Sequence, residues 1–95
     1  MAVVYMTYPV HPDKETAFQN AYAGILDVMR SADGHRESRL FKHVAEPSIF
    51  LIVSEWDSKA AYEAFVNSKQ FSEATSDWGK SNILLDQPRH HIIET

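Results

Sequence analysis

The sequence predicts an α+β fold in which two helices cover one face of a single antiparallel sheet. Three observations predict it. Strand-like and helix-like segments alternate in the order strand, helix, strand, strand, helix, strand; both helical segments are amphipathic; and one strand-like segment is apolar on both faces. This order is the split βαβ arrangement of ferredoxin-like folds. A chain of 95 residues has room for one hydrophobic core, so we expect a single domain over residues 1–95.

The first strand is expected from Ala2 to Val10, a run rich in Val and Tyr that two prolines close. Neither face of this strand carries a charge. One face would present Val3, Tyr5 and Thr7, and the other would present Val4, Met6 and Tyr8. The strand therefore suits burial on both sides.

The first helix is expected from about Lys14 to Arg30, because apolar residues recur there at helical spacing. These residues are Phe18, Ala21, Tyr22, Ile25 and Met29. Asp13 is a candidate N-cap. Gly34 follows the helix and can adopt the left-handed conformation that a turn needs.

The next two strands are expected from His35 to Ala45 and from Ile49 to Trp56. The link between them is short, which favours an antiparallel hairpin. The first of the two carries alternating charges, as edge strands often do. The second is apolar on both faces, with Ile49, Leu51 and Val53 on one side and Phe50, Ile52 and Trp56 on the other.

The second helical region begins after Asp57 and Ser58, either of which could be its N-cap. We expect a break at Asn67 and Ser68, and then a second short helix that ends at Gly79. The apolar positions of the two helices are Ala61, Tyr62, Phe65, Phe71, Ala74 and Trp78. The last strand is expected in two pieces, residues 82–85 and 90–93, because a proline interrupts the pattern.

Two helices can cover only one face of a sheet, and here two strands are apolar on both faces. The uncovered face would expose several large side chains together, which soluble monomers rarely do. At ~25 cal/mol per Å² of apolar surface, burying these side chains would contribute several kcal/mol, a large part of a small domain's stability. We therefore expect a homodimer in which a second copy covers this face, sheet against sheet.

The composition excludes several classes of function. The net charge is −4 at pH 7 and no basic run is present, which argues against a nucleic-acid partner and against an anionic membrane surface. The chain has no cysteine, so it forms no disulfide, thiolate nucleophile or thiolate metal site. The N-terminal segment has no positively charged region and is too short to span a bilayer. We expect a cytoplasmic location.

The stretch EWDSKAAYEAFVNSKQF, residues 55–71, resembles the antibiotic-biosynthesis-monooxygenase-like (ABM) domains. The closing PRHHIIE, residues 88–94, is similar to the last strand of that family. The resemblance spans the chain through the order of its elements, and its sharpest part runs from Ser54 to Phe71. It implies a ferredoxin-like chain that pairs into a dimeric α+β barrel, a fold that hosts several chemistries.

One branch of the family oxidises polycyclic aromatic intermediates without metal or flavin, and it uses a Trp at a strand end and a Tyr six residues later. Trp56 and Tyr62 match both positions, so the resemblance implies that they are catalytic. That branch also uses an Asn four residues before the Trp, where this chain has Ile52, and an Arg for which we find no counterpart. The alternative is that Trp56 seals the corner between strand and helix and that Tyr62 is a packing residue.

Five further residues are candidates for substrate binding: Tyr5, Thr7, Phe65, Phe71 and His91. Phe65 and Phe71 would form the wall of an apolar pocket between the helices and the sheet. Tyr5 and Thr7 would either line a cavity there or face the partner's sheet.

The five histidines are not spaced for a shared metal ion. His90 and His91 are adjacent on an expected strand, so they point to opposite faces. His35 and His43 would share a face but lie about 26 Å apart at ~3.3 Å per residue. We expect no metal and no cofactor. One of His43, His90 and His91 could act as an acid or base in the pocket, since imidazole titrates near neutral pH.

A heme-degrading branch of the family uses an Asn on the first strand, a Trp on the second helix and an iron-ligating His on the next helix. The corresponding positions here are Thr7, Phe65 and Thr75. The axial imidazole is therefore missing, and the resemblance does not imply that mechanism.

The sequence thus predicts a cofactor-independent monooxygenase that acts on a small aromatic substrate of the quinol or phenol type. In that chemistry the anion of the substrate reduces dioxygen, while the protein binds the ring, stabilises the anion and excludes water. Two alternatives stay open. One is a non-catalytic dimer that binds a small molecule or serves in a stress response, and the other is heme binding through a non-standard histidine.

Overall fold

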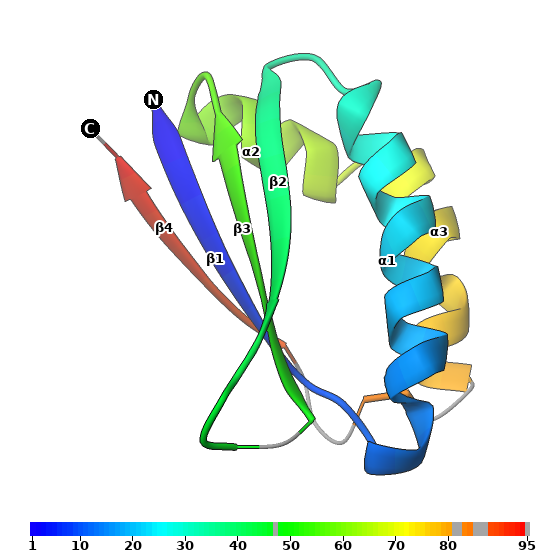
Figure 1. Ribbon diagram of the computed structural model, residues 1–95. Helices are drawn as coiled ribbons and strands as arrows, with labels where there is room; N and C mark the ends of the chain where they lie inside the picture. The colour runs from blue at the N-terminus through cyan, green and yellow to red at the C-terminus, as the bar shows by residue number, and fades with distance from the viewer. Residues whose placement is uncertain (47, 81–82, 85–87, 95) are drawn as a thin grey trace.

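The computed structural model of the chain describes residues 1–46, 48–80, 83–84 and 88–94, with backbone alone for 77–80. Within these residues the sheet order is β2-β3-β1-β4, and all neighbouring strands are antiparallel. The strands are β1 (Ala2–Pro9), β2 (His35–Lys42), β3 (Ile49–Trp56) and β4 (Arg89–Glu94). The helices, all on one face of the sheet, are α1 (Glu15–Arg30), α2 (Lys59–Val66) and α3 (Lys69–Lys80) (Figure 1). The predicted α+β ferredoxin-like fold is confirmed.

The alternation along the two central strands separates the faces of the sheet as predicted. The buried residues that point from β1 and β3 towards the helices are Ala2, Val4, Met6, Tyr8, Phe50, Ile52, Ser54 and Trp56. The two strands pair so that Ala2 lies opposite Trp56 and Tyr8 lies opposite Phe50. The residues between them are only half-buried, because they face away from the helices.

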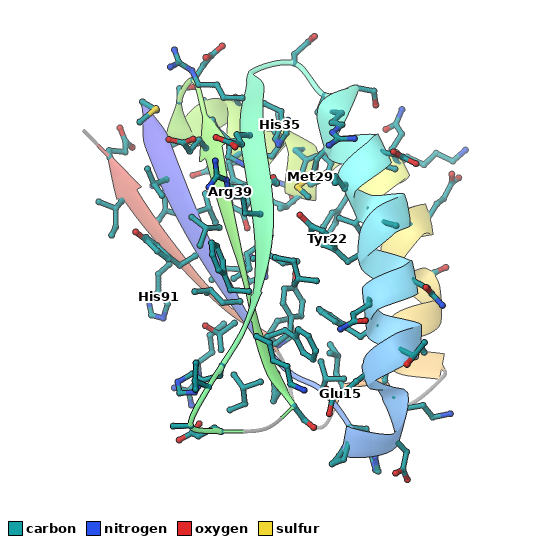
Figure 2. The ribbon with its side chains drawn as sticks, viewed as in Figure 1. Glu15, Tyr22, Met29, His35, Arg39 and His91 are labelled. Atoms are coloured by element: carbon teal, nitrogen blue, oxygen red, sulfur yellow. The ribbon has the colours of Figure 1, made fainter. Side chains whose placement is uncertain are left out.

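The first helix buries four of the five residues of the predicted stripe, Phe18, Tyr22, Ile25 and Met29, and the fifth, Ala21, is partly buried against the core. Tyr22 and Met29 point from α1 towards the sheet (Figure 2). The predicted N-cap, Asp13, was wrong. Pro12 starts a short 3-10 turn, η1 (Pro12–Lys14), which moves the start of α1 to Glu15 and leaves Lys14 at the cap position without a side-chain bond.

The second helix begins as predicted, because Ser58 caps it: the Ser58 hydroxyl accepts a hydrogen bond of 3.1 Å from the backbone N–H of Ala61. The predicted break after Val66 is confirmed. α3 continues one residue beyond Gly79, where the sequence predicted its end. Phe71 and Ala74 pack against the core, whereas the side chain of Trp78 lies outside the described part of the chain.

The two edge strands, β2 and β4, begin or end at other residues than predicted. β2 ends at Lys42 rather than at Ala45, because the backbone N–H of Glu46 donates to Nδ1 of His43 and the chain turns there. β4 extends the predicted 90–93 piece by one residue at each end. Of the predicted 82–85 piece, Leu84 forms an isolated bridge with Val10, and residues 82 and 85 lie outside the described residues.

A β-bulge corrects a prediction about two histidines. The register between β2 and β3 shifts between His35 and Glu37. The shift turns His35 to the helix side, where its ring meets that of Trp56 at 5.0 Å, while His43 lines a hollow on the other side. The predicted shared face for these two histidines was therefore wrong.

The face of the sheet that points away from the helices, here called the open face, is largely apolar. Its residues include Val3, Tyr5, Thr7, Phe41, Ile49, Leu51 and Val53, which line two shallow hollows of about 400 and 480 Å³. Phe41 is 48% exposed, and Val44, in the link after β2, is 99% exposed. Charges gather at one end, where Glu37 pairs with Arg39 and lies opposite Glu55.

Among the described residues, no helix combines the length and the apolar character that crossing a membrane requires.

Candidate functional site

A cluster of aromatic rings lies between the sheet and α2. Trp56, the last residue of β3, meets Tyr62 at 5.8 Å between ring centroids and an interplanar angle of 66°. It also meets Phe65 at 5.1 Å, and Phe65 in turn meets Phe71 of α3 at 5.1 Å and 70°. These tilted and edge-to-face contacts are the preferred geometries of aromatic pairs. The structure thus brings together four of the predicted site residues, which we call the aromatic cluster.

The position of Trp56 is fixed by a buried hydrogen bond. Its indole N–H donates to the hydroxyl of Ser54 at 2.9 Å, and both side chains are fully buried. The two residues lie two apart on β3, so both point to the helix side. Ser54 therefore satisfies a donor that would otherwise be buried without a partner.

The polar end of the aromatic cluster is a contact between Tyr62 and His90. The hydroxyl of Tyr62 forms a short hydrogen bond with Nδ1 of His90 on β4. Burial raises the pKa of Tyr62 to about 12, so this hydroxyl keeps its proton at neutral pH and can donate it. Burial, and then the neighbouring His91, lower the pKa of His90, so its imidazole is neutral and can accept.

A second tyrosine lies beside this pair. Tyr8 of β1 has its ring 6.4 Å from that of His90. Burial, and then the proximity of Tyr62, raise the pKa of Tyr8 well above its usual value. Both phenols are therefore neutral over the physiological range, and neither is a base on its own.

A groove opens onto the other end of the aromatic cluster. It has a volume of about 310 Å³ and lies between the C-terminal end of α1, α2 and the start of α3. Its described lining residues are Val28, Ser31, Ala32, Asp33, Ala61, Ala64, Phe65, Ser68 and Gln70. The volume is at the lower end of the range for small-molecule sites, about 300–1,000 Å³. Phe65 belongs to both the groove and the cluster, so it separates the groove from Trp56.

Three predicted substrate-binding residues lie elsewhere. Tyr5 and Thr7 are on the open face of β1, and His91 is opposite Tyr5 on β4. Figure 2 shows the His91 side chain pointing away from the helices. Residues on a strand alternate between faces, so a residue beside Val4 or Met6 cannot reach the same site as they do. The structure does not bring Tyr5, Thr7 and His91 to the aromatic cluster.

Sequence reasoning did not name two polar residues near the aromatic cluster, and of two adjacent histidines it named for substrate binding the one that lies on the open face. His90 pairs with Met6 across the β1–β4 ladder, which puts it on the helix side. The sequence has no signal for this register. Ser54 could have been found, because it is a polar residue at an inward position of an otherwise apolar strand. Tyr8 could have been found as the inward phenol at the far end of β1.

No group of three or more His, Asp or Glu side chains converges on a possible metal position among residues 1–46, 48–80, 83–84 and 88–94.

The geometry thus defines a class of protein: a small α+β domain with a buried aromatic cluster between its helices and its sheet. The chain belongs to the antibiotic biosynthesis monooxygenase (ABM) family, whose sequence profile matches residues 1–76. Its fold is similar to that of SnoaB, a cofactor-independent oxygenase from Streptomyces nogalater, in the crystal structure of a mutant of that enzyme. The two chains superpose with a TM-score of 0.82 at 11% identity, over 99% of this chain and 91% of SnoaB. At that identity, the likeness concerns the fold.

Two longer proteins are related in sequence. The chain is 42% identical over 89 residues, or 93% of its length, to a Haloarcula marismortui protein named "Putative heme-binding protein rrnAC3100". It is 33% identical over 67 residues, or 70% of its length, to a 42.8 kDa protein in the whiE locus of Streptomyces coelicolor. The aligned parts are only 13% and 17% of those two proteins, respectively.

Proposed function

We propose that the chain is a cofactor-independent monooxygenase that acts on a small aromatic substrate with a phenolic hydroxyl. The observation that carries this proposal is the contact of Trp56 with Tyr62 at 5.8 Å, in a buried aromatic cluster that ends in a polar hydroxyl. Such a cluster offers a ring both π-contacts and one hydrogen-bonding group that fixes its orientation. Membership in the ABM family and the likeness in fold to a cofactor-independent oxygenase support it.

The groove gives the ring a route to the cluster. A planar ring entering between α1 and α2 would first meet Phe65, which forms part of the groove wall. Phe65 and Tyr62 lie three residues apart on α2, so they are neighbours on one helix face. A rotation of the Phe65 side chain would therefore place a bound ring beside Tyr62, with Phe71 and Trp56 against its faces.

In the proposed reaction, electrons pass from the substrate to dioxygen. The hydroxyl of the substrate loses its proton, and the resulting anion transfers electrons to O₂, which forms a bond to a ring carbon. Loss of water leaves a carbonyl at that carbon. One oxygen atom enters the product, the other leaves as water, and the substrate supplies all four electrons. The described residues would bind the ring, stabilise the anion and exclude bulk water.

The test is oxygen consumption by the purified protein with a panel of hydroxylated aromatics. We expect turnover of at least one quinol, and a large loss of it in Tyr62→Phe. Tyr22→Phe is the matched control, because Tyr22 is also a buried core phenol but lies on α1, outside the aromatic cluster. If no substrate is consumed, the chain is a non-catalytic small-molecule-binding protein. If substrate is consumed and both variants match the wild type, Tyr62 has no part in the turnover.

Heme binding is a second candidate, which the name of the Haloarcula relative favours. The described residues that line the groove supply no axial ligand for a heme iron. They include no histidine, and Thr75, at the position where the heme-degrading branch has its ligand, uses its hydroxyl to donate to the carbonyl of Phe71 at 2.9 Å. We expect no Soret shift when hemin is titrated into the protein, and a saturable shift would favour heme binding instead.

We also propose that the open face is the interface of a homodimer in the cytoplasm. Fourteen residues line its two hollows, and most of them are apolar, while the helices cover the other side of the sheet. Val53 lies near the middle of this face, opposite Tyr5 and Arg39 on the neighbouring strands. A Val53→Glu variant should sediment as a monomer at micromolar concentration while the wild type sediments as a dimer. A monomeric wild type would contradict the proposal.

A further inference from the structure

We propose that Tyr62 and His90 form a proton relay, which takes the phenolic proton from the bound ring and passes it to solvent at the edge of the sheet. This inference rests on the proposed function and adds to it the base that the reaction needs. The motif of residues 55–71 supplies no base to the aromatic cluster, because its carboxylates, Glu55, Asp57 and Glu63, lie outside the cluster.

The relay connects the core to the solvent. Tyr62 is 3% exposed, whereas His90 is only partly buried, and part of its surface is in solvent. β4 is an edge strand of the sheet, so one side of His90 has no neighbouring strand. A proton that arrives at the Tyr62 hydroxyl therefore has a short path to water through the imidazole ring.

The hydrogen bond sets the direction of transfer. We assign Tyr62 as the donor in its hydrogen bond with Nδ1 of His90, and the neutral imidazole then carries its own proton on Nε2. When the ring's hydroxyl donates to the oxygen of Tyr62, the Tyr62 proton moves to Nδ1. The O–H bond of the substrate breaks, a new O–H bond forms on Tyr62, and a new N–H bond forms on His90. The products are a bound phenolate and an imidazolium, which then releases its Nε2 proton to water.

The charges around His90 suit a base of this kind. Tyr62 faces it from α2 and Tyr8 faces it from β1, and both are neutral phenols at neutral pH. On β4 itself, Arg89 and His91 flank it and belong to the opposite face. No carboxylate among the described residues contacts His90, so its imidazolium is not held by an ion pair and can lose its proton readily.

A first experiment tests the pairing without substrate. The nitrogen chemical shifts of the histidines in ¹⁵N-labelled protein report the tautomer of each ring. We expect the Nε2–H tautomer for His90 in the wild type, and a mixture of tautomers with a higher pKa in Tyr62→Phe, because the bond from Tyr62 favours the neutral ring. An unchanged His90 in Tyr62→Phe would overturn the relay.

A second experiment tests proton transfer with 4-nitrophenol, whose phenolate absorbs visible light. At a pH where the free probe is mostly protonated, binding to the wild type should increase the phenolate absorbance. His90→Gln should abolish this increase, because Gln can accept the hydrogen bond from Tyr62 but cannot take up a proton. A purely structural role for His90 would be rescued by Gln. Ionisation that persists in His90→Gln, or no binding of the probe at all, would overturn the relay.

The two adjacent histidines give a direct comparison during quinol turnover. Loss of a general base lowers kcat by about 10²-fold or more, so His90→Gln should show that loss and the disappearance of the acid limb of the pH profile. A loss in His91→Gln instead would overturn the relay in favour of the other face. If the probe ionises as expected but no quinol is consumed, the monooxygenase function fails while the relay stands. If turnover occurs and His90→Gln leaves it unchanged, the relay fails while the function stands.

Discussion

Substituting Gly34 by alanine should destabilise the protein strongly and displace the helix that carries Tyr62. Gly34 lies between α1 and β2 with a φ of 86°, in the left-handed region that favours glycine. A Cβ atom built there would lie 2.6 Å from the Cβ of Ala61 on α2. The carbonyl of Gly34 also accepts a hydrogen bond of 2.8 Å from the backbone N–H of Asp57, so neither segment can move away freely.

Two terms set the expected magnitude. The left-handed conformation costs a residue with a Cβ about 1–2 kcal/mol. Overpacking a tight contact costs about 1–3 kcal/mol. Gly34→Ala should therefore lower the free energy of unfolding by about 2–5 kcal/mol. In a domain of this size each kcal/mol lowers Tm by about 4–8 °C.

Urea unfolding at one fixed protein concentration measures this change, and further variants separate its causes. Gly24→Ala is the control: it adds the same methyl group in the exposed middle of α1, where nothing lies within 4 Å, and should stabilise by about 0.5–1 kcal/mol. Adding Ala61→Gly removes the contact but leaves the backbone strain at residue 34, so Gly34→Ala should cost only the strain part when it is measured against Ala61→Gly alone, which has its own helix cost.

Equal stability of Gly34→Ala and the wild type would refute the reasoning, since it would mean that α2 does not rest against this turn. If Gly34→Ala costs as much in the Ala61→Gly background as in the wild type, the packing part alone is refuted.

Three other predictions concern stability. Ser54→Ala should lower the free energy of unfolding by about 1–3 kcal/mol in denaturant titration, because it leaves the buried N–H of Trp56 without an acceptor, and an unchanged midpoint would contradict this. Burial lowers the pKa of both His35 and His90, so the unfolded chain binds protons more readily, and thermal scans should show stability falling as the pH drops below about 6.5. A stability that rises as the pH is lowered would contradict this prediction. Ser48 has a φ of 70°, so Ser48→Ala should be less stable than Ser48→Gly by about 1–2 kcal/mol, and the reverse order would argue against backbone strain there.

The order of elements and the two faces of the central strands could be predicted from the sequence because they depend on local patterns. Alternation separated Val3 from Val4 on β1 and Ile52 from Val53 on β3, and the structure has each pair on opposite faces. The helical spacing of Phe18 to Met29 was likewise sufficient. Local signals failed where a neighbour changed the geometry. Pro12 turned the expected helix start into a 3-10 turn.

The site could be predicted only in part from the sequence, because which residues it brings together depends on the register of the strands. Trp56, Tyr62, Phe65 and Phe71 come from one continuous stretch, and they do meet in space. Whether His90 or His91 joins them depends on how β4 aligns with β1, across most of the length of the chain. A shift of one residue exchanges the two, and no residue pattern within β4 decides between them.

The bulge between His35 and Glu37 is a second case of this kind. One extra residue in β2 reversed the predicted side of His35 and placed its ring against Trp56. Edge strands tolerate such bulges, and the charged sequence of β2 offers no apolar alternation against which the shift could be recognised.

The most direct test of the central claim, that this buried aromatic site inserts oxygen into a phenolic ring, is mass spectrometry of the product formed under ¹⁸O₂. We expect a product of quinol oxidation that carries a single labelled oxygen atom from the wild type and Tyr22→Phe, and little or none from Tyr62→Phe. A product without the label, or an equal labelled yield from Tyr62→Phe, would contradict the account.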